Sequence, residues 1–402
     1  MNYKKQALFN SLGNVIYLAS LWMLSIIITK TSGYNDAGIF SLAMTIGNVF
    51  FAFQMFGMRS YQVSDSSDEF GAEQYVKSRY LSCVFGIILC GLFLLFSKYT
   101  NKNKLIIMSF LLYKTLEAIS DSYFGELQKK GKLVVLAKSM SFKGIFTFAI
   151  FTIFMLIKKD LLISMICIVV LASAITFFYD FNQYRKYVDN SKKYTYVQSI
   201  CPLKKCFMLM VATIIPIVIT AIPRLVLEAQ YGTVELGYYG NISTPTVLIT
   251  AVVPTILTPF MTLYGELIKN KEYKKLYTYF INSLIATTMF GLGMEIMFFV
   301  LGKKIMTLLF TASIVPYVKY MFSLIFVMII YAFTMCCNSV LISLRRNNEV
   351  LIYTIVSLLA CILFSFISVE KFGISGVIFT MGISYGLQFI CQITNLYIKR
   401  EK

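Results

Sequence analysis

Runs of about twenty apolar residues recur along the whole chain, and they limit what it can fold into more than any other feature. A run of this length matches the hydrocarbon core of a bilayer. Because a backbone in lipid must satisfy its own hydrogen bonds, each run is predicted to be a helix. The chain is 58% hydrophobic and only 14% charged, whereas soluble domains are nearer a quarter charged. The sequence therefore predicts an all-α polytopic membrane protein.

The apolar runs predict twelve transmembrane helices, with a shorter apolar piece, 305–310, at the membrane surface. The predicted spans are 8–29, 37–57, 79–97, 105–125, 133–157, 161–181, 206–228, 241–264, 277–301, 317–343, 350–369 and 373–396.

The distribution of positive charge predicts the orientation of these helices. The net charge is +18, but the cations lie between the apolar runs rather than on one face, so no nucleic-acid partner is predicted. One alternate set of connections, with both termini, holds more than twice as many lysines and arginines as the other set. By the positive-inside rule, both termini are expected in the cytoplasm of a multi-pass protein.

A short glycine pattern occurs twice and suggests a duplicated unit. Gly33, Asp36, Gly38 and Phe40 have the same spacing as a second set 199 residues later, which comprises Gly232, Glu235, Gly237 and Tyr239. Glycine permits the positive φ that a tight re-entry needs, so Gly33, Gly38, Gly232 and Gly237 are predicted as turn residues rather than ligand contacts.

The repeat predicts two halves of six helices each. We expect an N-terminal bundle at 1–181, a cytoplasmic linker at 182–205 and a C-terminal bundle at 206–402. Because each half has an even number of helices, both halves share one topology and are related by a pseudo-two-fold axis along the membrane normal. Two such bundles suit alternating access.

Several chemistries are not predicted. The chain contains no histidine and its cysteines lie mostly inside apolar runs, so neither a metal site nor a disulfide framework is expected. No P-loop is present, so ATP is not expected to drive transport within this chain. No outer connection is long enough for a catalytic domain, which argues against an enzyme. No cofactor is predicted.

Charged residues inside the predicted spans are costly and usually face a cavity or a partner. On span four, Lys114, Glu117 and Asp121 stand at i, i+3 and i+7 and share one face. They form either an internal ion pair or a polar stripe along a substrate path.

Span five carries two lysines at different depths. Lys143 lies ten residues in, about 15 Å deep, so it is expected to face a cavity. Lys138 is closer to the cytoplasmic interface and can reach it through its stem. With Arg59 at the end of span two, these lysines and Lys114 are the cavity candidates of the first half.

Span seven combines prolines and a charge pair. Pro216 and Pro223 predict breaks or kinks that act as hinges. Arg224 presents a planar fork suited to phosphate oxygens, and Glu228, one turn on, is its expected partner. In span nine, Glu295 has no local partner, so it is a candidate for proton coupling or for a pair with a cation of another helix.

Several short motifs are similar to those of the polysaccharide-transporter family, which includes the O-antigen and capsule repeat-unit flippases. They are Asn10-Ser11-Leu12-Gly13-Asn14, Ala37-Gly38-Ile39-Phe40-Ser41-Leu42-Ala43, Phe56-Gly57-Met58-Arg59, Ile222-Pro223-Arg224-Leu225-Val226-Leu227, Glu235-Leu236-Gly237-Tyr238-Tyr239-Gly240 and Phe372-Gly373-Ile374-Ser375-Gly376-Val377. The family belongs to the MOP superfamily, with the multidrug and toxin extrusion (MATE) transporters. One departure is Pro223, which stands where the family often has an acid.

The resemblance implies a MATE-like pair of bundles in the bacterial cytoplasmic membrane. It implies a flippase that moves an undecaprenyl-diphosphate-linked oligosaccharide to the outer leaflet, with the diphosphate in a cationic cleft and the lipid tail in the bilayer. Polymerase and chain-length proteins of the same pathway are candidate partners. Two alternatives remain open at this stage: a cation-coupled drug or metabolite exporter, and a membrane polymerase or ligase.

Overall fold

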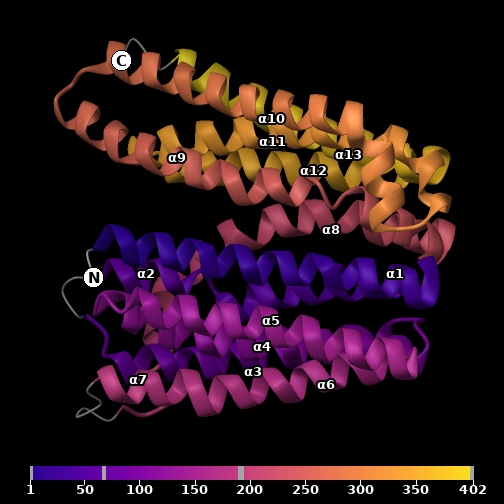
Figure 1. The fold of residues 1–402 in the computed structure, drawn as a ribbon. Helices are drawn as coiled ribbons and strands as arrows, with labels where there is room; N and C mark the ends of the chain where they lie inside the picture. The colour runs from indigo at the N-terminus through magenta and orange to yellow at the C-terminus, as the bar shows by residue number, and fades with distance from the viewer. Residues whose placement is uncertain (1–2, 66–68, 189–193, 399–402) are drawn as a thin grey trace. The chain divides into compact units, whose positions relative to one another are not determined.

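A computed structural model describes residues 3–65, 69–188 and 194–398, and every regular element in them is helical (Figure 1). Residues 189–193 of the predicted linker lie outside the described residues. The elements are α1 (Tyr3–Met55), α2 (Met58–Ser64), α3 (Ala72–Phe96), α4 (Asn101–Lys129), α5 (Leu133–Lys158), α6 (Leu161–Ala174), a π-helical segment (Ile175–Asp180), α7 (Phe181–Tyr187), α8 (Ile200–Ile242), α9 (Thr246–Lys269), α10 (Tyr273–Leu309), a 3-10 turn (Ala312–Tyr317), α11 (Val318–Ser343), α12 (Asn347–Phe372) and α13 (Ile374–Ile398).

The chain divides into two compact units, Met1–Ile217 and Val218–Lys402, which we call unit 1 and unit 2. In unit 1, α1 packs on α5 and α4, and α4 also packs on α3 and α6. In unit 2, α13 packs on α12 and α11, while α10 packs on α9 and α11. The division falls inside α8, so the first turns of this helix belong with unit 1.

Two of the elements contain a sharp bend at a single glycine. In α1, Gly33 has φ 84° and ψ −174°, and in α8, Gly232 has φ 84° and ψ 176°. Only glycine adopts these angles without strain. The helix resumes at the next residue, so Gly38 and Gly237 are helical and make no turn. The restarts predicted at residues 37 and 241 were therefore too late.

The prolines of α8 do not break the helix. The backbone keeps helical dihedral angles at Pro216 and Pro223, and Gly232 is the residue of α8 with non-helical angles. The fixed φ of proline fits a helix, and neighbouring helices and side chains in a membrane protein can satisfy the freed carbonyl group. The break predicted at these prolines was wrong.

The helices have the surface of a membrane protein. Within the described residues, nine helical stretches are long and apolar enough to cross a membrane. Large apolar side chains such as Phe96, Phe178 and Phe299 are more than three-quarters exposed, which suits contact with lipid rather than water. Since α1 and α8 each contain two arms and α9 continues the second arm of α8, the fold has twelve membrane helices in two bundles. This confirms the predicted fold class.

Candidate functional site: the buried charges of the two units

The charged face predicted on α4 exists, but its members bond in two different places. Lys114 forms an ion pair with Glu117, and the hydroxyl of Tyr17 on α1 donates to the same carboxylate at 2.5 Å. The ammonium of Lys114 also lies 4.5 Å from the centre of the Phe51 ring. This pair therefore joins α4 to α1.

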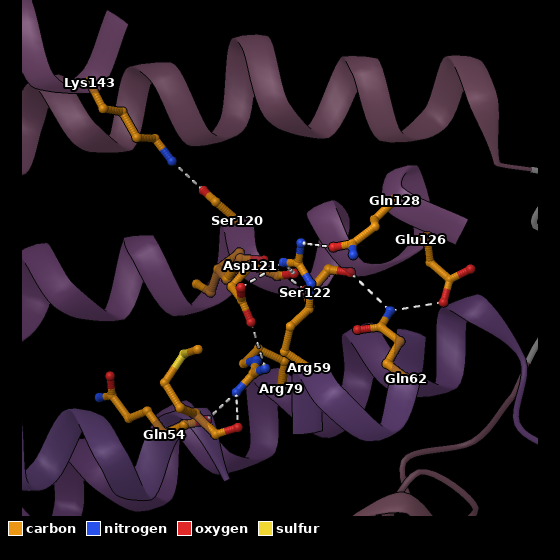
Figure 2. A network of polar contacts seen from close by, with 12 residues as sticks. Gln54, Arg59, Gln62, Arg79, Ser120, Asp121, Ser122, Glu126, Gln128 and Lys143 are labelled. Atoms are coloured by element: carbon orange, nitrogen blue, oxygen red, sulfur yellow. Dashed lines mark hydrogen bonds and ion pairs between the residues drawn. The ribbon is translucent and has the colours of Figure 1, made fainter. Parts of the chain in front are cut away.

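Asp121, one turn further along α4, is bonded by two arginines from other elements (Figure 2). Its carboxylate lies 2.6 Å from Nη1 of Arg59 on α2 and 3.1 Å from Nη2 of Arg79 on α3. Arg59 also donates to the Asp121 carbonyl and, at 2.8 Å, to Gln128 Oε1. Asp121 thus joins α2 and α3 to α4.

Arg79 also caps the end of α1. Its Nη1 donates to the carbonyl oxygens of Gln54 at 2.7 Å and Met55 at 2.5 Å. These carbonyls come just before Phe56 and Gly57, whose φ values of 54° and 62° end the helix. The helix end leaves carbonyl groups without intrahelical partners, and the guanidinium supplies the missing donors. Arg79 was predicted to lie at the start of span three, but α3 begins at Ala72 and buries Arg79 completely.

Close packing of α2 on α4 depends on an amide and a glycine. The Gln62 side chain donates to the Ser122 carbonyl at 3.1 Å and to Glu126 at 2.8 Å (Figure 2). A Cβ atom at Gly125 would lie 2.1 Å from the Gln62 amide oxygen, so a larger residue there would displace the Gln62 side chain from its hydrogen bonds. Sequence reasoning missed Gln62 and Glu126. A polar residue at the end of an apolar span was the available signal.

Lys143 is buried and bonded on α5. Its ammonium donates to Ser120 Oγ at 2.5 Å and pairs with Asp180 Oδ2 at 2.7 Å. The other oxygen of Asp180 accepts a hydrogen bond from Ser139 at 2.5 Å. Asp180 was not predicted as a partner. Lys138, on the same helix, is exposed.

Unit 2 contains a cation in a different situation. The guanidinium of Arg224 lies 5.3 Å from the centre of the buried Tyr239 ring. Its Nε is buried without a hydrogen-bond partner, and within the described part of the chain it forms no ion pair. Glu228, the predicted partner, is partly buried one turn further along α8. The buried hydroxyl of Tyr385 on α13 is also without a hydrogen-bond partner among the described residues.

Glu295, the other charged candidate of unit 2, lies in an apolar environment. It lines a groove of about 550 Å³ between α10, α11 and α13. The other lining residues are apolar except for one serine: Phe322, Ser323, Phe326, Val327, Ile330, Ile378, Phe379, Gly382 and Ile383.

One ion pair lies outside the membrane-spanning segments, at the starts of α4 and α6. Lys102 donates to Asp160 at 2.8 Å and joins the start of α4 to the start of α6. This hydrogen bond lowers the pKa of the Asp160 carboxyl below its ordinary value. In the described residues, no cluster of three or more histidine, cysteine, aspartate or glutamate side chains could hold a metal ion.

The arrangement separates two kinds of cation. In unit 1, Arg59, Arg79, Lys114 and Lys143 each bond a carboxylate of the same unit. In unit 2, the described residues leave Arg224 with an aromatic ring instead. A partly buried cation without a carboxylate can accept an anion from outside the protein.

Comparisons with known proteins agree with this fold. No family model matches the chain. The sequence is 22% identical over 395 residues to a capsular polysaccharide biosynthesis protein, CapF of Staphylococcus aureus, and the match covers 96% of this chain and 97% of that protein.

Solved structures give the architecture. An inward-facing multidrug resistance MATE transporter of the MOP superfamily matches with a TM-score of 0.64 and 14% identity, over 99% of this chain and 96% of that chain. A variant of the Vibrio cholerae MATE transporter VcmN matches with a TM-score of 0.64 and 12% identity, over 99% and 97%. A MOP-superfamily transporter from Pyrococcus furiosus gives 0.61 and 13%, over 100% and 97%. The resemblance seen in the motifs is thus confirmed: the chain is a multi-pass membrane protein with the MOP-superfamily transporter fold, similar over nearly its full length to a capsular polysaccharide biosynthesis protein.

Proposed function

We propose that this protein is a flippase for undecaprenyl-diphosphate-linked oligosaccharides, which it moves from the inner to the outer leaflet by alternating access. The product would serve the synthesis of a capsule, an O-antigen or a related surface polysaccharide. The transporter fold and the similarity to a capsule biosynthesis protein support this class. The proposal of a lipid-linked substrate is more specific, and it rests on one structural observation.

That observation is Arg224. A charge inside a membrane protein costs about 2.5–3.5 kcal/mol on the insertion scale, so it is expected to have a partner or a function. Within the described residues, the guanidinium has a ring face but no carboxylate, and its Nε has no acceptor. A guanidinium binds phosphate oxygens through two parallel hydrogen bonds. A diphosphate would supply the missing anion.

The lysines of unit 1 have a different role in this proposal. Lys143 and Lys114 are already bonded to Asp180 and Glu117. Their positive charges are balanced within the protein, so we assign them to the stability of unit 1. Arg59 keeps about a quarter of its side chain exposed and is the candidate in unit 1 for contact with the substrate.

The test is complementation of a strain that lacks the protein. We expect Arg224→Ala to reduce surface polysaccharide at least tenfold, because the diphosphate loses its partner, and Arg224→Lys to restore part of it. Lys138→Ala, which changes an exposed cation, should leave the polymer unchanged. Membrane levels of each variant are measured by immunoblot.

Normal polymer from an Arg224→Ala variant at normal membrane level would refute the role of this residue. The same strains also test the exporter alternative. If the protein raised resistance to cationic dyes and had no effect on polysaccharide, it would be an exporter instead.

We also propose that the protein lies in the bacterial cytoplasmic membrane with both termini in the cytoplasm. The excess of lysine and arginine in the connections on that side supports this orientation. A green fluorescent protein fused to the C-terminus should fluoresce, and an alkaline phosphatase fused there should be inactive. The opposite pair of results would reverse the orientation.

A further inference from the structure

The pocket around Lys143 has more oxygen atoms than an ion pair requires. The ammonium contacts Asp180 Oδ2 at 2.7 Å and Ser120 Oγ at 2.5 Å. Ser139 donates to the other oxygen of Asp180, and Thr176 lies 3.1 Å from Ser120 between their hydroxyl oxygens. Four of these side chains are completely buried, and Lys143 is 4% exposed. Hard monovalent and divalent cations prefer oxygen ligands, and this pocket supplies a carboxylate and three hydroxyl oxygens.

The pocket has one negative charge, that of the Asp180 carboxylate, which balances a single positive charge. The carboxylates of α4 bond other groups: Asp121 bonds Arg59 and Arg79, Glu117 bonds Lys114, and Glu126 bonds the Gln62 amide. The face of the Phe124 ring, 5.6 Å from the ammonium, adds a further attraction for a cation. A divalent ion would leave an uncompensated charge in an apolar bundle, whereas a monovalent ion would not.

The backbone departs from α-helical geometry at the segment that carries Asp180 into the pocket. Residues Ile175–Asp180 form a π-helix, and Asp180 is its last residue. Short π-helical turns are rare and are often found at functional sites. The extra residue in the turn changes the direction of Asp180 relative to α6, and this direction is the one that meets Ser139 and Lys143 on α5. Three elements, α4, α5 and the π segment, thus supply oxygens to one point.

We infer that this pocket is a binding site for a monovalent metal cation in which the ammonium of Lys143 takes the place of the ion. The long apolar stem of lysine places the charge among the oxygens without an ion from solution. The wild-type protein therefore has its cation covalently attached, and unit 1 is stable without sodium. This inference does not depend on the identity of the transported substrate.

Removal of the lysine side chain should open the site to a free ion. In Lys143→Ala, the stem leaves a cavity beside Asp180 that can hold a small cation and water. A ligand that binds only the folded state raises stability with the logarithm of its concentration. We therefore expect the unfolding temperature of Lys143→Ala to rise by about 3–6 °C between 1 and 100 mM sodium chloride.

The experiment measures thermal unfolding of the purified full-length protein in sodium, lithium or potassium chloride, with N-methyl-D-glucamine chloride to keep the ionic strength constant. The wild type should show no dependence on the metal ion. The double variant Lys143→Ala/Asp180→Asn should also show none, because it lacks both the ammonium and the carboxylate. Lys114→Ala is a matched control, since it also removes an ammonium from a carboxylate, but Glu117 bonds a phenol rather than a set of serine and threonine hydroxyls.

Three results would overturn the inference. Lys143→Ala could fold and show the same unfolding temperature in every salt. It could fail to fold in every salt while the double variant folds, which would mean that no metal ion replaces the ammonium. Finally, the unfolding temperature of Lys114→Ala could rise with sodium as much as that of Lys143→Ala. Sodium would then stabilise any carboxylate that has lost its ammonium partner, and the pocket would not be specific.

Discussion

Asp121→Ala should destabilise the protein by about 3–5 kcal/mol, the cost of leaving a buried charge without its partner. The substitution removes the carboxylate that Arg59 and Arg79 share. The Arg79 side chain is fully buried, so water cannot replace the lost oxygen. Arg59 is partly exposed and keeps its bond to Gln128, so most of the cost arises at Arg79. Thermal unfolding of the purified protein measures the loss.

A control and a second-site change make this prediction specific. Glu272→Ala removes an ion pair with Lys275 in which both side chains are more than a third exposed, and it should cost less than about 1 kcal/mol. Arg79→Met in the Asp121→Ala background should recover part of the stability, because it removes the orphaned charge. The importance of this pair would be disproved if Asp121→Ala were as mild as Glu272→Ala.

Gly376→Ala should destabilise unit 2 by about 3 kcal/mol, at the upper end of the usual cost of overpacking. A Cβ atom at Gly376 would lie 2.1 Å from the Ser368 carbonyl oxygen and 2.6 Å from Val369 Cα. Both atoms belong to the backbone of α12, so no side chain can rotate away to make room. The two helices would have to separate, although Gly373 holds them together by a bend with φ 54°.

The same helix provides a matched control. Gly386 also lies on α13, and a Cβ atom there would meet nothing within 4 Å. Gly386→Ala should be neutral or stabilise the helix by about 0.5–1 kcal/mol, because alanine favours helix more than glycine does. Equal unfolding temperatures for the two variants would show that α12 and α13 do not pack as closely as described.

The sequence predicted the helices and the shared face of α4 because both follow from spacing along one segment. Lys114 and Glu117, three residues apart, are bonded as that spacing allows. The partners of Asp121 lie 62 and 42 residues away in the chain, and no periodicity reveals a contact at that separation. The pair of Lys143 with Asp180 was missed for a similar reason, since Asp180 was placed at the end of a predicted span, whereas the helix continues to Tyr187.

The errors at the bends have a different cause. Proline and glycine both have a low helix propensity, so Pro223 and Gly232 were both candidates for a bend. The angles at Gly232 require glycine, whereas Pro223 keeps helical angles within α8. Gly38 and Gly237 repeat the spacing of the turn without taking part in it. The repeated motif therefore included the two residues at which the chain bends, Gly33 and Gly232, together with two glycines at which it does not.

The polarity of α4 has a consequence for how this protein is made. Among the described helices, α4 is not one of the nine stretches apolar enough to cross a membrane, although it contacts α1, α3 and α6 at the centre of its unit. Such a segment is expected to partition poorly from the translocon into lipid when it is alone. The groups from other helices that bond its carboxylates Glu117 and Asp121, namely Tyr17, Arg59 and Arg79, all precede it in the chain. Synthesis from the N-terminus thus delivers the groups that neutralise α4 before α4 itself leaves the ribosome, and the nascent chain need not hold bare charges in the bilayer.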